Sequence, residues 1–318
     1  MLSLNCAVLP KIIEGEITMS EKSKLFFNGK KKVIGMVHLL PLPGNAAYQN
    51  NKEEIVKNAI EDAHTLIDCG VDAIMLENFS DWPQYSTEIP LEAYSLMVSI
   101  ATRIREFCKI PFGVNIEMNA FVQEWAMAYA VDADFIRFEA YVDNRAGSFG
   151  YIEACSTPLA KIRQDYPSDT MIFADVHTAE TYGVPNVAIN ELAGNAKGHD
   201  ADAVIVTEND LNKKITPADV KSMREEMGDF PIIVGAGVKP NNVLDYMEYC
   251  DAVIVGRGFK TGDRVDEARQ GVHGDRPQQV QLIFAPSFTF QIDRKRRPGR
   301  PTGAARSLWE ALRHFLTS

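Results

Sequence analysis

Short apolar segments recur through the middle of the chain, and each is about as long as a β-strand. They are rich in valine and isoleucine, and few polar residues interrupt them, which is the pattern of strands buried on both faces. We predict eight such strands. They run from Val33 to His38, Ala73 to Glu77, Pro111 to Ile116, Phe135 to Phe138, Met171 to Val176, Ala203 to Thr207, Ile232 to Gly235 and Ala252 to Gly256.

Helical periodicity fills most of the intervals between these segments. The clearest example places Ile55, Ala59, Ala63 and Ile67 on one face of a helix that stops at Gly70. Buried strands that alternate with helices are typical of parallel β/α architecture.

A short repeat narrows the architecture further. An Asp-Ala step precedes the second, fourth, sixth and eighth predicted strands, in "VDAIML", "DADFIRF", "DADAVIVT" and "CDAVIVG", whereas proline precedes or opens the third and seventh. This alternation over eight strands indicates a (βα)8 TIM barrel built from doubled units. A doubly wound sheet is the alternative, but no G-x-G-x-x-G motif follows the first strand. We therefore predict the TIM barrel.

The composition limits the class of protein. The 318 residues are 46% hydrophobic and 24% charged, which indicates a globular chain, and the net charge of −10 argues against a general nucleic-acid binder. No apolar run is long enough to span a membrane. The five cysteines are widely spaced and include no C-x-x-C motif, so we expect reduced thiols and a cytoplasmic location. We also expect a homo-oligomer and no cofactor.

The two ends differ from the middle of the chain. Residues 264–318 contain nine arginines, one lysine and five acidic residues, including the run "RKRRPGRP". This tail is either an anion-binding arm or a frameshifted or fused end that is foreign to the fold, and we favour the second interpretation. Near the other end Met19 is a plausible start, and we expect little packed structure before about Phe26. The predicted division is an N-terminal extension (1–30), the barrel (31–263) and an irregular or disordered basic tail (264–318).

Polar residues gather where the predicted strands end, and TIM barrels carry their chemistry at that end. Residues two apart on a strand point to the same side, so three pairs are expected to aim into one mouth. These pairs are Asn115 with Glu117, Arg137 with Glu139, and Asp175 with His177; the other residues there are His38, Glu77, Asn78, Thr207 and Asn209.

The candidate catalytic residues are drawn from this mouth. Asp175 is the best candidate for general acid–base chemistry, and Glu77, Asn115, Arg137 and His177 are expected to position a hydroxylated substrate. Two alternatives stay open: a purely structural ion pair between Arg137 and a neighbouring glutamate, and an Asp175 that only orients its neighbours.

A metal held by the histidines together with Glu77 or Asp175 is a further alternative. No compact ligand spacing supports it, so we expect no metal.

Glycine pairs follow the seventh and eighth predicted strands, in "VGAGVKPNN" and "VGRGFKTG". Phosphate groups in TIM barrels commonly bind between these two loops. We expect Gly235, Gly237, Gly256 and Gly258 to expose backbone N–H groups to a phosphate, and Lys260 to add positive charge. The alternative is that the glycines only turn the chain, but two matched pairs in the two expected loops favour a phosphate site.

Several of these motifs together resemble those of the BtpA/SgcQ family, over about Lys31 to Asp263. They are "VIGMVHLLPLPG", "DAIMLENFSDWPQ", "DFIRFEAYV", "VGAGVKPNNV" and "VIVGRGFKTG". The resemblance implies a TIM barrel close to the phosphate-binding barrels, in a family with links to photosystem I biogenesis and to sugar metabolism. The sequence departs from the family after Arg264, where the helical periodicity expected of a last closing helix is lost.

Two functions of different classes follow. The first is an enzyme of lyase, isomerase or glycosidase type that acts on a small phosphorylated metabolite, such as a sugar phosphate or nucleoside phosphate. The second is a non-enzymatic assembly factor for a membrane-bound complex such as photosystem I, associated peripherally with the membrane. We favour the enzyme, because a polar mouth beside matched glycine loops has no reason to persist in a docking protein.

Overall fold

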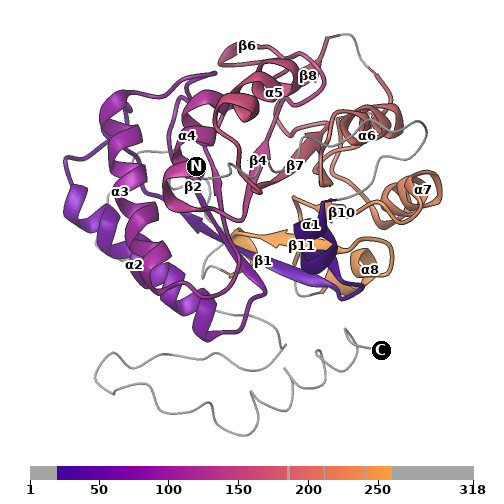
Figure 1. Ribbon diagram of the computed structural model, residues 1–318, viewed down its shortest axis with the longest axis horizontal. Coiled ribbons are helices and arrows are strands. Elements are labelled where there is room, and N and C mark those ends of the chain that lie inside the picture. Colours follow the sequence, from indigo (N-terminus) through magenta and orange to yellow (C-terminus); the bar gives the residue numbers. More distant parts are fainter. Residues whose placement is uncertain (1–19, 185–186, 211, 240, 260–318) are drawn as a thin grey trace, which may run out of the picture.

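Eight parallel strands close into a barrel, which confirms the predicted TIM fold (Figure 1). The computed structural model describes residues 20–184, 187–210, 212–239 and 241–259. Around the barrel, hydrogen-bonded neighbours follow the order β1-β11-β10-β9-β7-β4-β3-β2, and every predicted strand is present with its ends displaced by one residue at most. The strands are β1 (Lys32–His38), β2 (Ala73–Glu77), β3 (Phe112–Asn115), β4 (Phe135–Phe138), β7 (Met171–Val176), β9 (Ala203–Val206), β10 (Ile232–Val234) and β11 (Ala252–Val255).

Helices surround the outside of the barrel (Figure 1). The start of α7 shows how the sequence sets a boundary: Pro217 is its first residue, and Thr216 and Asp219 form a reciprocal capping box. The helices that cover the strands are α2 (Lys52–Asp68), α3 (Leu91–Phe107), α4 (Phe121–Val131), α5 (Ser156–Asp165), α6 (Ile189–Gly198), α7 (Pro217–Met227) and α8 (Val243–Met247).

A small antiparallel sheet, which the sequence did not predict, is formed by β5 (Arg145–Gly147), β6 (Gly150–Ile152) and β8 (Tyr182–Gly183). Two of its strands follow β4 and the third follows β7, so the sheet lies at the carboxyl ends of the barrel strands (Figure 1). Strands of two or three residues carry too few positions to show an alternating pattern.

Alternation along the barrel strands divides the buried side chains into two cores. On β1, Val33 and Val37 point outward and join the large core between the strands and the helices. Ile34 and Met36 point inward and join a second core inside the barrel. This second core also includes the inward side chains Met75, Phe135, Met171, Phe173, Ile205, Ile233 and Ile254.

The helix α1 (Glu21–Phe27) closes the barrel at the amino ends of its strands. Phe26 and Phe27 lie in the inner core, and the Phe26 ring centroid is 6.0 Å from that of Phe135 and also 6.0 Å from that of Phe173. We expected little packed structure before about Phe26. The helix instead begins at Glu21 and buries Ser23, because its two phenylalanines fill the open end of the barrel.

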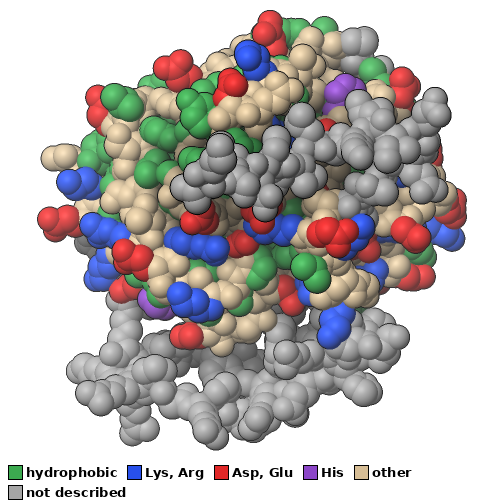
Figure 2. All heavy atoms as spheres, in the orientation of Figure 1, with side chains coloured by type: hydrophobic (Ala, Val, Ile, Leu, Met, Phe, Trp, Pro, Cys, Tyr) green, Lys and Arg blue, Asp and Glu red, His purple; other side chains and the backbone are tan. Residues whose placement is uncertain are grey.

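Charges of both signs are interspersed over the face of the molecule shown in Figure 2. Among the described residues, no helix is long and apolar enough to cross a membrane. The basic tail from residue 264 and the predicted phosphate ligand Lys260 lie outside the described residues.

Candidate functional site

Each barrel strand places one residue in a ring at the carboxyl end, directly above the inner apolar core. These residues occupy the next inward-facing position after the apolar ones, so strand alternation alone brings them to one level. The neighbouring residues His38, Glu77 and Asn115 are paired in register across β1, β2 and β3. The full ring consists of His38, Glu77, Asn115, Arg137, Asp175, Thr207, Gly235 and Gly256.

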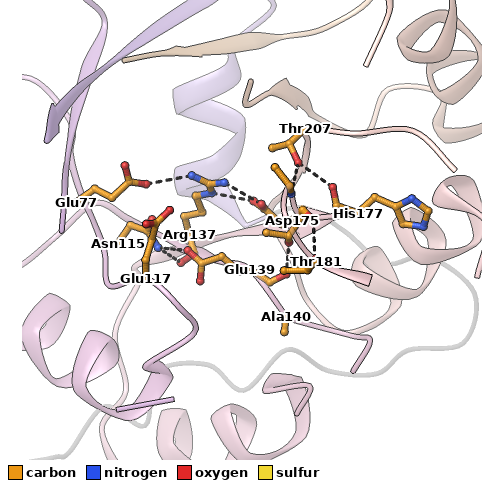
Figure 3. Close-up of polar contacts among 12 residues, drawn as sticks. Glu77, Asn115, Glu117, Arg137, Glu139, Ala140, Asp175, His177, Thr181 and Thr207 are labelled. Carbon is orange, nitrogen blue, oxygen red and sulfur yellow. Dashed lines mark hydrogen bonds and ion pairs between the residues drawn. The ribbon is translucent and has the colours of Figure 1, made fainter. Parts of the chain in front are cut away.

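Arg137 lies at the centre of this ring, and its guanidinium is held by two carboxylates (Figure 3). Its Nε and Nη2 each donate to Asp175 across 2.9 Å, and its Nη1 donates to Glu77 Oε1 across 3.1 Å. Burial disfavours the charged form, but the carboxylates outweigh it and hold the pKa of Arg137 well above its ordinary value. The guanidinium is therefore a fixed positive charge whose orientation is set from two sides.

Glu77 also reaches His38, on the side away from Arg137. His38 Nε2 lies 3.0 Å from Glu77 Oε2, so the two oxygens of Glu77 contact different partners. The imidazole stacks on Phe79 with a centroid separation of 4.3 Å and an angle of 15° between the planes. His38, Glu77, Arg137 and Asp175 thus form a continuous line of ionisable groups from four strands.

Two more glutamates lie beside Arg137 (Figure 3). Glu139 accepts hydrogen bonds from Asn115 Nδ2 at 2.7 Å and from the backbone N–H of Asn119 at 2.9 Å. Burial, only partly offset by Arg137, raises the pKa of Glu139 to about 7. Glu117 accepts from Gln84 at 2.5 Å, and burial together with the charges of Glu77 and Glu139 raises its pKa well above the ordinary value. The site therefore contains two carboxyl groups whose pKa values are raised by burial.

Asn115 connects these groups and has an unmet acceptor. Its Nδ2 donates to Glu139 Oε1 and to the carbonyl oxygen of Arg137. Its Oδ1 is buried and has no hydrogen-bond partner among the described residues. A buried acceptor of this kind is expected to receive a hydrogen bond from a ligand or from water.

His177 is not part of the mouth, contrary to the expectation from strand alternation. β7 ends at Val176, and His177 has φ +55°, which breaks the alternation that would have placed it beside Asp175. Figure 3 shows its ring pointing away from Arg137. The ring nitrogens lie 3.2 Å from the carbonyl oxygen of Asn209 and 2.8 Å from that of Val187, so His177 ties neighbouring loops together.

Two of the predicted phosphate-binding glycines are explained by packing. A Cβ at Gly235 would lie 2.5 Å from Ile205 Cγ2 on the neighbouring strand. A Cβ at Gly256 would lie 2.5 Å from Cε1 of His38. We expected an anion's oxygen to need this space, but protein atoms fill it at both positions.

The loop after β10 retains the features that an anion site needs. Gly237 has φ +72°, and no atom lies within 4 Å of the position that its Cβ would occupy. The backbone N–H groups of Ala236, Gly237 and Val238 donate to no acceptor among the described residues. Successive N–H groups of this kind can form an anion-binding concavity. The β11 loop touches this one, because a Cβ at Gly258 would lie 3.1 Å from the Val238 carbonyl oxygen.

The site also contains groups that the sequence analysis named without a role or did not name. His38, Glu117 and Glu139 stood at predicted strand ends, and that position was the signal that placed them in the mouth. Gln84 and Asn119 lie in loops and contact the two glutamates, and no periodicity marks such positions.

Most of the chain is similar to one family of proteins. Residues 29–274 match the sequence profile of the BtpA family, which extends past the predicted end of the barrel at Asp263. An uncharacterized protein of Methanocaldococcus jannaschii is 37% identical over 231 residues, covering 73% of this chain and 87% of the relative. The photosystem I biogenesis protein BtpA of Synechocystis is 29% identical over 244 residues, covering 76% of this chain and 85% of the relative.

Among solved structures, (S)-3-O-geranylgeranylglyceryl phosphate synthase from Thermoplasma acidophilum is similar in fold. It aligns with a TM-score of 0.47 and 16% identity, covering 79% of this chain and 95% of the synthase.

Proposed function

The chain belongs to the BtpA family, and from that premise we propose that it is an enzyme acting on a small phosphorylated metabolite by acid–base chemistry. The observation that carries this proposal is the ring at the carboxyl end of the barrel. There a fixed guanidinium and protonable carboxyls lie on the same barrel end as a loop with three backbone N–H groups that have no acceptor among the described residues. A sugar phosphate or a nucleoside phosphate has the groups that such a site would bind.

The phosphate is assigned to the loop after β10. Its binding rests on the N–H groups of Ala236, Gly237 and Val238, because N–H dipoles attract an anion without an adjacent cation. The side chains of Lys239 and Arg257 are exposed at the rim and add positive charge. Within the pair of loops, Gly258 allows the β11 loop to approach, and Gly235 and Gly256 leave room for neighbouring side chains.

The remaining part of the metabolite is assigned to the polar ring. Arg137 and the unpartnered Oδ1 of Asn115 would bind its oxygen and hydroxyl groups. Both oxygens of Asp175 accept from Arg137, so we assign Asp175 to orienting the guanidinium instead of carrying the proton. The raised pKa of Glu139, about 7, allows it to donate a proton near neutral pH. Glu117, whose pKa burial also raises, is the second candidate donor.

The test is a ligand screen with a matched pair of glycine variants. Thermal unfolding of the full chain would be followed against sugar phosphates, nucleoside phosphates and their unphosphorylated counterparts, with product detection by ³¹P NMR. We expect stabilisation by phosphorylated compounds only. Gly237→Ala should abolish it, since the new Cβ enters the proposed anion space.

Gly228→Ala is the control for this variant. Gly228 also has a positive φ (+59°) and open space around it, but it ends α7 at the other end of the barrel. Both variants carry a backbone penalty of about 1–2 kcal/mol. Equal loss of ligand binding in the two variants, or no response to any phosphorylated compound, contradicts the proposal.

A second candidate function rests on the relative from Synechocystis, whose name places it in photosystem I biogenesis. On this alternative the barrel is an assembly factor that associates peripherally with a membrane. A silent ligand screen, together with co-sedimentation of the purified chain with membranes, would favour it. The enzyme hypothesis also includes a cytoplasmic location and a homo-oligomer, and analytical ultracentrifugation tests the second.

A further inference from the structure

We propose that His38 and Glu77 form a further proton-transfer pair in this site, and that residue 256 is a glycine because the imidazole needs the space beside it. The inference rests on the proposed function, because a proton-transfer pair requires a reaction. It adds a catalytic role for His38 and a reason for Gly256 that does not involve a phosphate. The pair lies between Arg137 and the β11 loop.

Contacts with Glu77, Phe79 and Gly256 hold the imidazole of His38 in one position. Its Nε2 lies 3.0 Å from Glu77 Oε2, and one face stacks on Phe79 at 4.3 Å. Its Cε1 edge lies against the backbone of Gly256, so closely that a Cβ there would be 2.5 Å away. The side chain of His38 is 7% exposed, and that of Glu77 is 2% exposed. A histidine fixed in this way is oriented for proton transfer.

The surrounding charges favour a protonated His38 beside an ionised Glu77. Arg137 donates to the other oxygen of Glu77, and a nearby positive charge favours a carboxylate. An ionised Glu77 in turn favours the imidazolium. Among the described residues, the charged groups near the pair include Asp175 from β7, bound to Arg137, and Glu117 after β3.

Asp175 is less suited to this role than Glu77. Both of its oxygens are bound by one guanidinium, so a proton transferred to it would break a bidentate ion pair. Glu77 instead divides its oxygens between Arg137 and His38, so one oxygen can stabilise the charge of the imidazolium while the other stays bound to Arg137.

His38 belongs to the polar ring and also lies beside the β11 loop, next to the proposed phosphate site. Gly256 follows β11, whose loop touches the proposed anion loop, so a metabolite with its phosphate there would place its next atoms near His38. In the proposed step one N–H bond of the imidazolium breaks and the proton forms a bond to a substrate oxygen or carbon. The pair loses one positive charge, the substrate gains it, and the reverse step regenerates the imidazolium.

The first experiment follows the histidine ring signals of the ¹⁵N-labelled full chain by NMR as the pH is changed. The sequence has six histidines, and the signal lost in His38→Gln identifies His38. We expect Glu77→Gln to lower the pKa of His38 by about 1 unit or more, because the carboxylate is lost. His64→Gln, at a helix position where the ring stacks on Phe107, is the control that should leave the His38 titration unchanged.

The second experiment tests the contact with Gly256. Gly256→Ala should displace the imidazole and shift the His38 signals. Gly194→Ala should not, because a Cβ at Gly194 in α6 meets no atom within 4 Å. With a substrate from the screen, His38→Gln should lower kcat by about 10²–10⁴-fold. If Glu77→Gln and Gly256→Ala both leave the His38 signals as in the parent, the pair does not exist and the inference is overturned.

Inorganic phosphate separates this inference from the proposed function. If both hold, phosphate shifts the His38 signal in the parent chain and not in Gly237→Ala. If phosphate shifts it but Glu77→Gln leaves the His38 pKa unchanged, the anion site stands and the pair is overturned. If Glu77→Gln lowers the pKa but no phosphorylated compound binds, the contact between His38 and Glu77 stands, whereas the proposed function fails and the proton-transfer role of the pair fails with it.

Discussion

The two halves of the barrel interior use the same strands for opposite purposes. On β4, Phe135 lies in the half near α1 and Arg137 lies two residues further on; on β7, Phe173 and Asp175 have the same relation. The half near α1, here called the lower half, is filled by stacked rings, and the ring centroids of Phe135 and Phe173 lie 4.8 Å apart. The half at the carboxyl ends of the strands, here called the upper half, is filled by ion pairs. Because burying these charges costs desolvation energy, such pairs seldom add net stability. The comparison indicates that the lower half supplies stability, and on the proposed function the upper half supplies the chemistry.

Removing the central cation should give the largest effect of all. Arg137→Met keeps much of the side-chain volume but removes the guanidinium that neutralises Asp175, Glu77 and Glu139. We expect a loss of about 3–5 kcal/mol in the free energy of unfolding at pH 8, measured with urea. The loss should shrink at pH 5, because the unpaired carboxyls can then take up protons. An equal loss at both pH values would mean that packing, and not charge, dominates the upper half.

The matching change in the lower half should behave differently. Phe26→Ala removes a ring packed on Phe135 and Phe173, and we expect a loss of about 3 kcal/mol. This loss should be the same at pH 5 and pH 8, because no titratable group takes part. Leu25→Ala is the control, since Leu25 is in the same helix but 75% exposed. If Phe26→Ala costs no more than Leu25→Ala, α1 does not contribute to the core.

The smallest expected effect is on the pH dependence of stability. Burial raises the pKa of Glu139 from 4.5 to about 7, so between these values the folded chain binds more protons than the unfolded chain. The contribution of Glu139 therefore makes the free energy of unfolding fall as pH rises, by up to about 1.4 kcal/mol per pH unit. Glu139→Gln removes this slope, at a fixed cost of about 1 kcal/mol for a lost hydrogen bond.

Urea unfolding at pH 5, 6 and 7 checks this prediction. The free energy of unfolding of Glu139→Gln should rise with pH relative to the parent. A constant difference across the three pH values would show that Glu139 is ionised throughout this range.

The sequence was most informative where the backbone is regular. Unbroken apolar runs located all eight strands, and alternation along them placed Glu77, Asn115, Arg137 and Asp175 in one ring. The same rule failed for His177, because the strand ends one residue earlier and a positive φ reverses the side chain. Alternation holds only while the chain stays extended.

Partners that lie far apart in the sequence were beyond this kind of prediction. Gly256 looked like a phosphate-binding glycine because of its neighbours along the chain, whereas its contact is with His38, which lies on the adjacent strand β1. The function of α1 was missed for a similar reason. In the sequence its two phenylalanines look like any short apolar run. Only the structure shows that they fill the open end of the barrel.

Among the described residues, α1 and the inner core fill the barrel at the amino ends of its strands. On the proposed function, a reactant would therefore reach Arg137 from the carboxyl end, and its product would leave by the same route. Product would have to leave before the next substrate could bind, so accumulated product would compete directly with substrate. A binder raised against the small sheet of β5, β6 and β8 would obstruct entry and exit together.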